Sequence, residues 1–217
     1  MKAGVLFSGG KDSCFAAHIC HFLGFEAVLF SVVPADKYDM IYHYPNIIYT
    51  KLQAEAMGLE HVFIRSGDDN LSEALVKNNI KALFTGGIRS DFQRWHFHSI
   101  ANVLGLPLMS PLWLKNKKYY QELSDSFSCI FVRVAAEGLG KEFLGKPIKT
   151  AAHIKGVDKF FEGGEAESFV VDAPLFKRRI EISQYEIITD GMCHTLAIKG
   201  ARLVEKKLEN DSCCSMH

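Results

Sequence analysis

Six consecutive residues near the start of the chain have side chains that suit the binding of a phosphate chain: Ser8, Gly9, Gly10, Lys11, Asp12 and Ser13. Glycines let the backbone come close to an anion, and the free N–H groups at the start of a helix attract it. The hydroxyl groups of Ser8 and Ser13 add donors, Lys11 adds a positive charge, and Asp12 supplies a carboxylate that suits magnesium. We therefore predict that this run binds phosphates, with Lys11 and Asp12 taking part in catalysis.

This run is not a Walker A loop. That motif has a glycine, four further residues and then Gly-Lys-Ser/Thr. Here Val5 stands where the first glycine should be, and Asp12 follows the lysine. The sequence therefore predicts a phosphate site of another class, with a glycine-rich turn that binds no ligand as the alternative.

A second glycine pair, Gly86 and Gly87, follows an apolar run and precedes a helical pattern. In an open doubly wound sheet, ligands bind outside the carboxyl ends of the strands, where the strand order reverses. If the order is 3-2-1-4-5, the loops with the two glycine pairs flank that point. We predict that Gly86 and Gly87 contact a nucleotide, that Ser31 lies near its base, and that Arg94 stabilises the charge on its phosphates. A plain strand–helix turn is the alternative for this pair.

A third candidate site lies in the second half of the chain, where carboxylates surround two glycines just before an apolar strand. Its residues are Glu162, Gly163, Gly164, Glu165 and Glu167. Carboxylates at this spacing suit magnesium, an ammonium ion or a cationic substrate group, and an acidic turn at a strand start is the alternative. His43, in a tyrosine-rich loop, is a further candidate because loops carry binding residues.

Short apolar runs alternate with helical patterns over the first half of the chain, which predicts βαβ units and a doubly wound parallel sheet of five strands. The predicted strands are residues 3–7, 27–33, 61–65, 82–85 and 106–109. The predicted helices are residues 12–23, 46–57, 69–78 and 91–104. Phe15, Ile19, Phe22 and Leu23 recur at helical spacing, so we expect them to form the buried face of the first helix.

The pattern changes after about residue 120. Strands are predicted at residues 128–134, 169–172, 177–189 and 193–204, with a helix ending near Phe161. Asp190-Gly191 is a hairpin signal between the last two strands. We therefore predict an α/β nucleotide-binding domain over residues 1–124, a smaller α+β domain over residues 125–208, and a polar tail over residues 209–217.

The composition indicates a soluble protein with its own hydrophobic core. The chain has 217 residues, of which 48% are hydrophobic, and 25 basic residues balance 25 acidic ones. A nucleic-acid-binding protein usually has a basic excess, so a nucleic-acid partner is not expected. The six cysteines contain no CxxC pair, which indicates a reducing compartment and no zinc site. No leader peptide or membrane-spanning run is recognised, so we expect a cytoplasmic protein.

The run from Ser8 to Ser13 resembles the pyrophosphate loop, or PP-loop, of the ATP pyrophosphatases, which cleave ATP to AMP and pyrophosphate. Further stretches resemble one branch of that group, the diphthine–ammonia ligases: Tyr42-His43, Gln53-Ala54, Met57-Gly58, Gly86-Gly87, Gln93-Arg94, Pro111-Leu112-Trp113, Glu162-Gly163-Gly164-Glu165 and Pro174-Leu175-Phe176. The PP-loop specifies only ATP chemistry, whereas the acidic stretch is more specific to the branch. Two positions depart from the pattern, because Ala166 stands where we expect an aromatic residue and His96 where we expect a basic one.

The resemblance implies an adenine nucleotide α-hydrolase-like fold and an amide ligase that uses ATP and Mg²⁺. The implied reaction is the last step of diphthamide synthesis: ATP activates the diphthine carboxylate of translation elongation factor 2, and ammonium then gives the amide, AMP and pyrophosphate. The resemblance implies that the PP-loop, Ser31, Gly86 and Gly87 bind ATP, and that Asp12 helps to bind magnesium. His43 and the acidic stretch would line the substrate and ammonium side. The sequence leaves a homodimer open.

Two other functions remain open at this stage. A PP-loop enzyme that modifies tRNA by thiolation would need a nucleophilic cysteine near the ATP, and Cys14 is the only candidate. A non-catalytic module that senses adenine nucleotides would bind ATP or AMP without turnover. An assay of pyrophosphate release separates this sensor from an enzyme.

Overall fold

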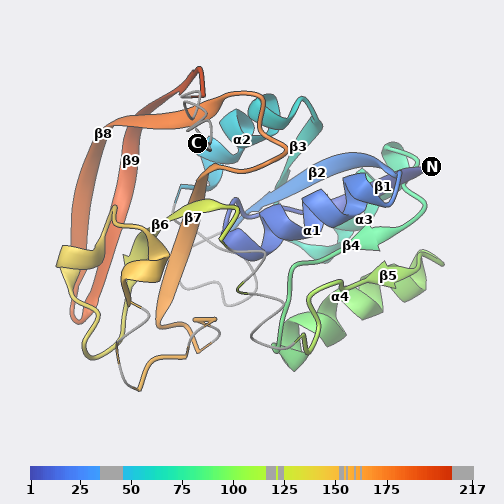
Figure 1. Cartoon of the computed structure of the whole chain (residues 1–217). Coiled ribbons are helices and arrows are strands. Elements are labelled where there is room, and N and C mark those ends of the chain that lie inside the picture. Colours follow the sequence, from blue (N-terminus) through green and yellow to red (C-terminus); the bar gives the residue numbers. More distant parts are fainter. Residues whose placement is uncertain are drawn as a thin grey trace, which may run out of the picture.

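The computed structural model describes residues 1–34, 46–115, 121, 125–151, 154, 156–158, 160–161 and 163–206. This part of the chain contains two β-sheets, one in each half of the sequence (Figure 1). Three predictions lie outside the described residues: the roles of His43 and Glu162, and the polar tail over residues 209–217.

The first sheet has five strands, all parallel, in the order β3-β2-β1-β4-β5. The strands are β1 (Lys2–Leu6), β2 (Glu26–Val33), β3 (Glu60–Arg65), β4 (Leu83–Phe84) and β5 (Leu108–Met109). The apolar runs of the three inner strands β2, β1 and β4 are largely buried, as expected of a parallel sheet covered by helices, whereas the edge strands β3 and β5 are partly exposed. The predicted strand order is therefore confirmed, and the switch point lies between β1 and β4.

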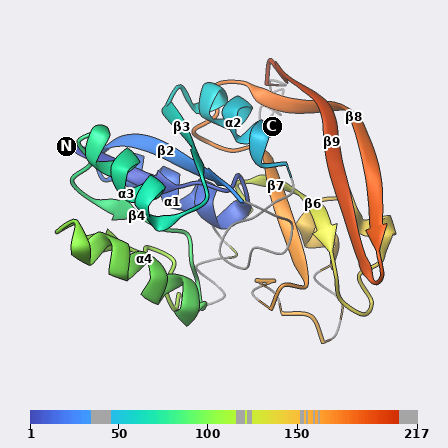
Figure 2. The same ribbon diagram turned by 180° about the vertical axis from the view of Figure 1, so that it is seen from behind.

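Helices cover both faces of this sheet, which makes it doubly wound as predicted. The helices are α1 (Lys11–Phe22), α2 (Thr50–Met57, after a 3₁₀ turn over Ile47–Tyr49), α3 (Asp68–Lys77) and α4 (Asp91–Val103). The helices α1 and α2 share one core with one face, while α3 and α4 share a second core with the other (Figure 2). Gly58 ends α2 with a φ of 71°, a left-handed conformation that glycine adopts without strain.

The predicted buried face of α1 is partly wrong. Phe15 is buried, but Phe22 is 73% exposed and Leu23 is 58% exposed. The reason is that α1 packs against the first sheet and also against the second half of the chain, where the Phe127 ring lies 5.6 Å from that of Phe15. A helix enclosed on two sides buries small residues such as Ala16 and Ala17, while its last turn projects into solvent.

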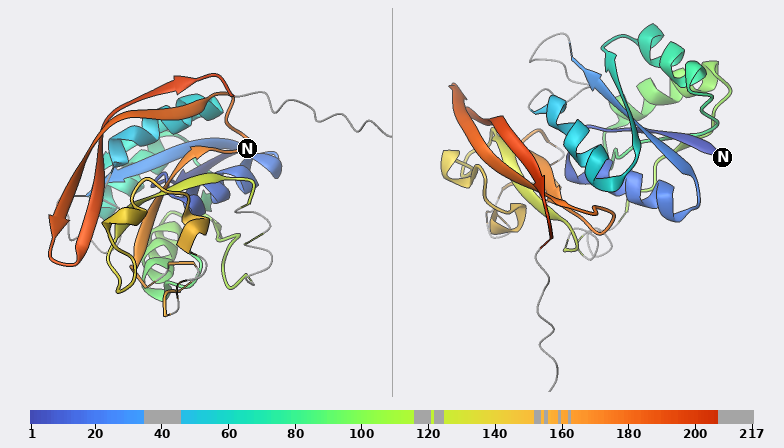
Figure 3. Two further views of the ribbon diagram at one scale, coloured as in Figure 1. Left: turned by 60° about the vertical axis from the view of Figure 1, so that its left-hand side comes forward. Right: turned by 90° about the horizontal axis from the view of Figure 1, so that it is seen from above.

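The second sheet is antiparallel, with the order β7-β6-β9-β8. Its strands are β6 (Ser128–Val134), β7 (Ala166–Asp172), β8 (Arg179–Asp190) and β9 (Cys193–Val204). The predicted hairpin is confirmed, because β8 and β9 pair up to Asp190 and Cys193 and Gly191 has a φ of 61°. This long hairpin curves along one side of the molecule (Figure 3).

The helix predicted to end near Phe161 is wrong. In the described residues between β6 and β7, the only helical segments are two 3₁₀ turns, Lys141–Phe143 and Ile148–Ala151. Gly138 and Gly145 have φ values of 84° and 76°, and such left-handed residues break a helix. The apolar residues of this stretch pack instead as a small cluster against β6.

The two sheets share one hydrophobic core. A single cluster of buried residues combines Val5 of β1 and Ala16 of α1 with Val170 of β7 and Ile198 of β9. The domain boundary after residue 124 therefore stays a prediction. None of the helices in the described part of the chain is long and apolar enough to cross a membrane.

His18 joins α1 to the segment that follows β7. Its Nδ1 lies 2.7 Å from the carbonyl oxygen of Cys14, and the N–H of Leu175 donates to its Nε2 at 3.0 Å. Because the backbone N–H occupies Nε2, the proton of the neutral ring must be on Nδ1. Burial lowers the pKa of His18 to about 4. The ring therefore stays neutral at pH values where an exposed histidine would be half protonated.

Acidification is expected to destabilise the protein between pH 6.5 and 4. In this range the unfolded chain binds a proton at His18, whose ordinary pKa is 6.5, and the folded protein does not. The free energy of unfolding should fall by up to about 3 kcal/mol for this residue as the pH drops. Urea unfolding at pH 7, 6, 5 and 4.5 measures this change in the free energy of unfolding. His18→Gln should flatten the pH dependence, and His98→Gln, which changes an exposed histidine of α4, should not. Equal slopes in all three proteins would contradict the assignment.

Candidate functional site

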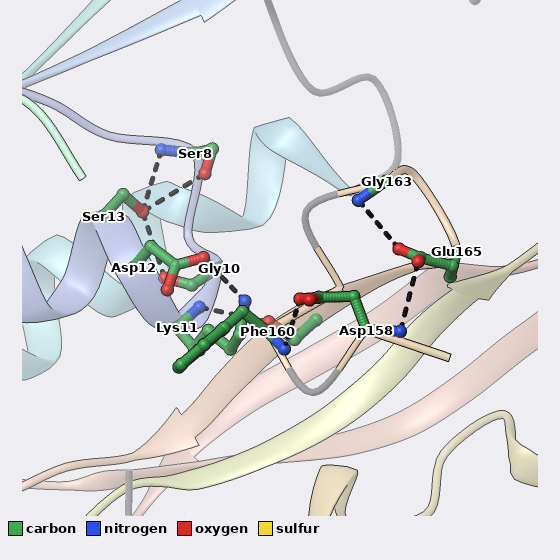
Figure 4. Close-up of polar contacts among 10 residues, drawn as sticks. Ser8, Gly10, Lys11, Asp12, Ser13, Asp158, Phe160, Gly163 and Glu165 are labelled. Carbon is green, nitrogen blue, oxygen red and sulfur yellow. Dashed lines mark hydrogen bonds and ion pairs between the residues drawn. The ribbon is translucent and has the colours of Figure 1, made fainter. Parts of the chain in front are cut away.

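The PP-loop closes on itself at the start of α1. The hydroxyl of Ser13 donates to the carbonyl oxygen of Gly10 at 3.1 Å and accepts the backbone N–H of Ser8 at 3.2 Å. The Ser8 hydroxyl lies 3.2 Å from the same oxygen (Figure 4). These bonds hold the loop between β1 and α1 in a compact turn. The positive end of the α1 dipole lies at this turn, which is the arrangement that favours a bound anion.

Gly9 is the position in this loop where only glycine fits. Its φ is 79°, and a Cβ there would overlap the side chain of Gln53. The side-chain amide of Gln53 donates to the carbonyl oxygens of Gly9 and Val170, both at 2.8 Å. The N–H of Val170 in turn donates to Gly9 at 3.0 Å. Gln53, fully buried on α2, thus joins the loop to β7. No role for Gln53 was predicted, because its partners lie far away in the sequence.

Lys11 and Asp12 form an ion pair at the first turn of α1. The Lys11 Nζ lies 2.7 Å from Oδ2 of Asp12, and Lys11 as a whole is only 8% exposed. The backbone N–H of Lys11 donates to the hydroxyl of Ser168 on β7 at 3.1 Å, a contact that the sequence did not predict. Nζ also lies 5.9 Å from the centre of the Phe161 ring. The predicted phosphate lysine is therefore enclosed by groups from both halves of the chain.

The second glycine pair lies directly against the PP-loop. A Cβ on Gly86 would be 2.6 Å from the carbonyl carbon and oxygen of Asp12, and 2.7 Å from the backbone nitrogen of Ser13. A Cβ on Gly87 would meet no atom within 4 Å. The two glycine-rich loops therefore meet at the switch point, where the sequence predicted them. Gly86 makes the close contact between the loops, and Gly87 faces open space.

Ser31 is more deeply buried than a contact with a nucleotide base would require. Its hydroxyl donates to the carbonyl oxygen of Phe7 at 2.7 Å and lies 3.0 Å from Oγ1 of Thr50 and 2.8 Å from Nε2 of His61. Its side chain is fully buried. The network joins the carboxyl end of β2 to β3 and to the start of α2. In this arrangement Ser31 supports the site through its neighbours, and a direct contact with ATP stays a prediction.

Arg94 projects from the first turns of α4, close to the second loop in sequence. The helix begins with a capping bond in which the Ser90 hydroxyl accepts the N–H of Gln93 at 3.3 Å. The Arg94 guanidinium stacks on the Trp113 ring at 4.4 Å and is exposed to solvent. This residue is therefore accessible, and its predicted role at the phosphates stays a prediction.

The carboxylates of the acidic stretch bind protein groups. Glu165 accepts the backbone N–H groups of Asp158 at 3.2 Å and Gly163 at 2.8 Å, so it shapes its own loop (Figure 4). Glu167 forms an ion pair of 2.9 Å with Arg133 on β6. Gly163 and Gly164 are exposed. Of the predicted substrate-side residues that the structure describes, the two carboxylates thus have structural partners and the two glycines are accessible.

A magnesium site built from protein side chains alone is not present in the described residues, where no group of three or more His, Cys, Asp or Glu is placed to bind a metal ion. Magnesium in phosphate-transfer sites is commonly held by one or two carboxylates together with the phosphates. The Asp12 carboxylate, 24% exposed at the phosphate loop, fits that pattern.

Cys14 does not have the properties of a nucleophile. It is fully buried, and its Sγ lies 3.7 Å from the carbonyl oxygen of Gly9. Burial raises the pKa of this thiol well above its usual value, with a smaller contribution from Cys129. A reactive cysteine instead needs an accessible thiolate.

Comparison with known proteins places the chain in a family. The family model of the diphthamide synthase N-terminal domain matches residues 1–108, and that of the diphthamide synthase C-terminal domain matches residues 115–204. A diphthine–ammonia ligase of Schizosaccharomyces pombe is 30% identical, with the alignment covering 96% of this chain and 40% of that protein. The bovine diphthine–ammonia ligase is 28% identical, and the alignment covers 97% of this chain and 93% of that protein.

The chain therefore spans less than half of the fission-yeast relative but nearly all of the bovine one. A crystal structure described as a predicted subunit of tRNA methyltransferase from Methanocaldococcus jannaschii has a TM-score of 0.47 and 18% identity, and covers 80% of this chain and 98% of that one. This likeness is too weak to bear on function. The two family matches are consecutive and together span most of the chain, which belongs to the diphthamide synthase family.

Proposed function

We propose that this protein is an ATP-dependent ligase that amidates the diphthine of translation elongation factor 2 with ammonium. The observation that carries the proposal is the meeting of two glycine-rich loops with a buried lysine, next to a strand from the family's C-terminal domain. The curated relatives are named diphthine–ammonia ligases, which supports the same acceptor and nitrogen donor.

The reaction has two half-reactions. An oxygen of the diphthine carboxylate attacks the α-phosphorus of ATP, and the bond to the β-phosphate breaks to release pyrophosphate. The nitrogen of ammonia then attacks the acyl carbon of the acyl-adenylate, and AMP leaves with the bonding electrons while the nitrogen loses one proton to give the amide. A carboxylate is a poor acyl donor and AMP is a good leaving group, which explains the need for ATP.

The PP-loop residues hold the pyrophosphate as it departs. The backbone of Gly9 and Gly10 and the hydroxyls of Ser8 and Ser13 supply hydrogen bonds, and Lys11 supplies the positive charge. Gly86 and Gly87 bring a second stretch of backbone to the nucleotide. Asp12 would hold magnesium together with the phosphates, and the ion would share the negative charge of the leaving group. Arg94, exposed in the first turns of α4, would add a further positive charge near the phosphates.

The acceptor would approach from the second half of the chain. Gly163 is exposed near the PP-loop (Figure 4), and Gly164 is exposed as well. Glu165, which binds backbone N–H groups, brings a negative charge to that side, while the charge of Glu167 is paired with Arg133. A negative potential suits both ammonium and the quaternary ammonium group of diphthine. Cytoplasmic free ammonium is the proposed nitrogen source.

The decisive test is AMP release from ATP and magnesium with purified elongation factor 2 that carries diphthine, with and without ammonium chloride. Ammonium-dependent AMP formation with a loss of about one dalton from the modified histidine, the mass difference between OH and NH₂, would support the ligase. ATP binding without AMP formation under every condition would favour another acceptor or a nucleotide sensor.

Replacing Cys14 by serine is expected to leave the rate of AMP release within about threefold of the wild-type value. The hydroxyl can keep the contact with the Gly9 carbonyl, and no step of the amidation uses a thiol. The assay is the one described above. Complete loss of activity in Cys14→Ser, with circular dichroism unchanged, would favour the thiolation chemistry of a tRNA-modifying enzyme.

A further inference from the structure

One arginine connects the second glycine-rich loop to the acidic part of the C-terminal half. Arg89 lies two residues after Gly87, and its guanidinium stacks on the ring of Phe160 at 4.8 Å. Its Nη1 also lies 3.4 Å from Oδ2 of Asp158. Phe160 is buried and belongs to the core that the two sheets share. The contact therefore spans from the nucleotide side to the proposed acceptor side.

The partners of Arg89 belong to a loop that is organised by its own hydrogen bonds, which we call the acidic loop: Asp158, Phe160, Phe161, Gly163, Gly164 and Glu165. Oδ1 of Asp158 accepts the N–H of Phe160 at 2.8 Å. The N–H of Asp158 donates to Glu165, whose other oxygen accepts the N–H of Gly163. The Asp158 carboxylate thus binds Arg89 with one oxygen and the loop backbone with the other. Figure 4 shows its contact with the Phe160 N–H.

The acidic loop lies next to Lys11 in a strained conformation. Phe161 has a φ of 60°, a left-handed value that is rare for a bulky residue and persists only when the surroundings hold it. Its ring packs against Phe131 at 5.3 Å and lies 5.9 Å from the Lys11 ammonium. A loop of this kind needs contacts to keep it in place beside the PP-loop.

We propose that Arg89 is a positioning residue that holds the acidic loop against the nucleotide site, so that the acceptor side lies beside the place where ATP binds. The proposal rests on the function proposed above, because that function assigns the acidic loop to the ammonium side. In this proposal Arg89 acts through its contacts with Phe160 and Asp158. Breaking its contacts lowers the fraction of molecules with the loop in place, which weakens acceptor binding in proportion.

The ion pair alone would carry little weight. Its Arg89 and Asp158 side chains are 49% and 33% exposed, and ion pairs in such positions contribute little. The planar guanidinium adds stacking on a buried aromatic ring, which an ammonium group reproduces poorly. Arg89→Lys should therefore hold the acidic loop little better than Arg89→Leu does.

Amide hydrogen exchange tests the positioning without any need for activity. In Arg89→Leu, the amides of Asp158, Phe160 and Gly163 should exchange on the order of tenfold faster than in the wild type, with Arg89→Lys close to the leucine variant. Arg178→Leu is the matched control, because Arg178 also reaches across the halves, to Glu55 at 2.9 Å, but away from the acidic loop. The control should leave these three amides unchanged.

Kinetics then link the position of the loop to the acceptor. In Arg89→Leu the KM for ammonium chloride should rise on the order of tenfold, while the KM for ATP and the kcat at saturation stay within about twofold. Unchanged exchange in the acidic loop, or an equal rise over the whole second sheet with a lower Tm, would overturn the proposal. If the wild type releases no AMP, the proposed function fails, and the exchange experiment still decides whether Arg89 holds the loop.

Discussion

Replacing Lys11 by alanine is expected to lower the rate of AMP release on the order of a thousandfold while the protein stays folded. The ammonium of Lys11 is the positive charge enclosed at the PP-loop, with the Asp12 carboxylate at 2.7 Å. Charge develops on the pyrophosphate as it leaves, and a preorganised cation in a water-excluded site stabilises that charge most effectively. The measurement is AMP formation at saturating ATP, with circular dichroism and Tm on the same samples.

Lys2→Ala is the matched control for this experiment. Lys2 begins β1, pairs with Glu60 at 3.1 Å, and lies at the opposite end of the strand from the PP-loop. Its loss should leave turnover within about twofold, because surface ion pairs contribute little. Removal of Lys11 also leaves the Asp12 carboxylate without that partner, so Lys11→Arg, which keeps the charge but not the shape, should retain part of the activity. Near-normal turnover in Lys11→Ala would contradict the assignment of Lys11 to the departing pyrophosphate.

The features that were predicted correctly are those that a short stretch of sequence determines by itself. The apolar runs of the first half, the glycine pairs at 9–10 and 86–87, and the Asp190-Gly191 turn each reflect a local constraint of burial or backbone conformation. Once the runs were read as a doubly wound sheet, its topology brought the two glycine-rich loops together. The sequence therefore predicted that the two loops lie close together, whereas the specific contact between Gly86 and Asp12 comes from the structure.

The features that were missed depend on contacts between distant residues. Gln53 and Ser168 bind the PP-loop across 44 and 157 positions of the chain. Gln53-Ala54 is part of the family resemblance, but no local pattern shows what either side chain binds. Glu165 was assigned to the substrate from its charge, whereas its two oxygens bind backbone N–H groups of its own loop. Charge and spacing identify a group that could bind a ligand, but hydrogen-bond partners decide whether it is available.

Replacing Gly86 by alanine is expected to disrupt the nucleotide site, although the change adds a single methyl group. Its Cβ would be 2.6 Å from the carbonyl carbon and oxygen of Asp12. Both atoms belong to the backbone of α1, so no side-chain rotation can relieve the overlap. Either the PP-loop or the loop after β4 has to move, at a cost on the order of 3 kcal/mol. We expect a lower Tm and at least about a hundredfold loss of AMP release, because a misplaced binding group is costly to catalysis.

Gly87→Ala separates this contact from a general requirement for flexibility in the loop. A Cβ on Gly87 meets no atom within 4 Å, and its φ is not in the left-handed range. Alanine there should change the free energy of unfolding by less than about 0.5 kcal/mol. If ATP approaches over Gly87, this variant should raise the KM for ATP without lowering the Tm, whereas Gly86→Ala lowers both stability and turnover. If the two variants had the same Tm, KM for ATP and turnover, the close contact of Gly86 with the PP-loop would not matter for the site. The location of the ATP site would then have to be revised.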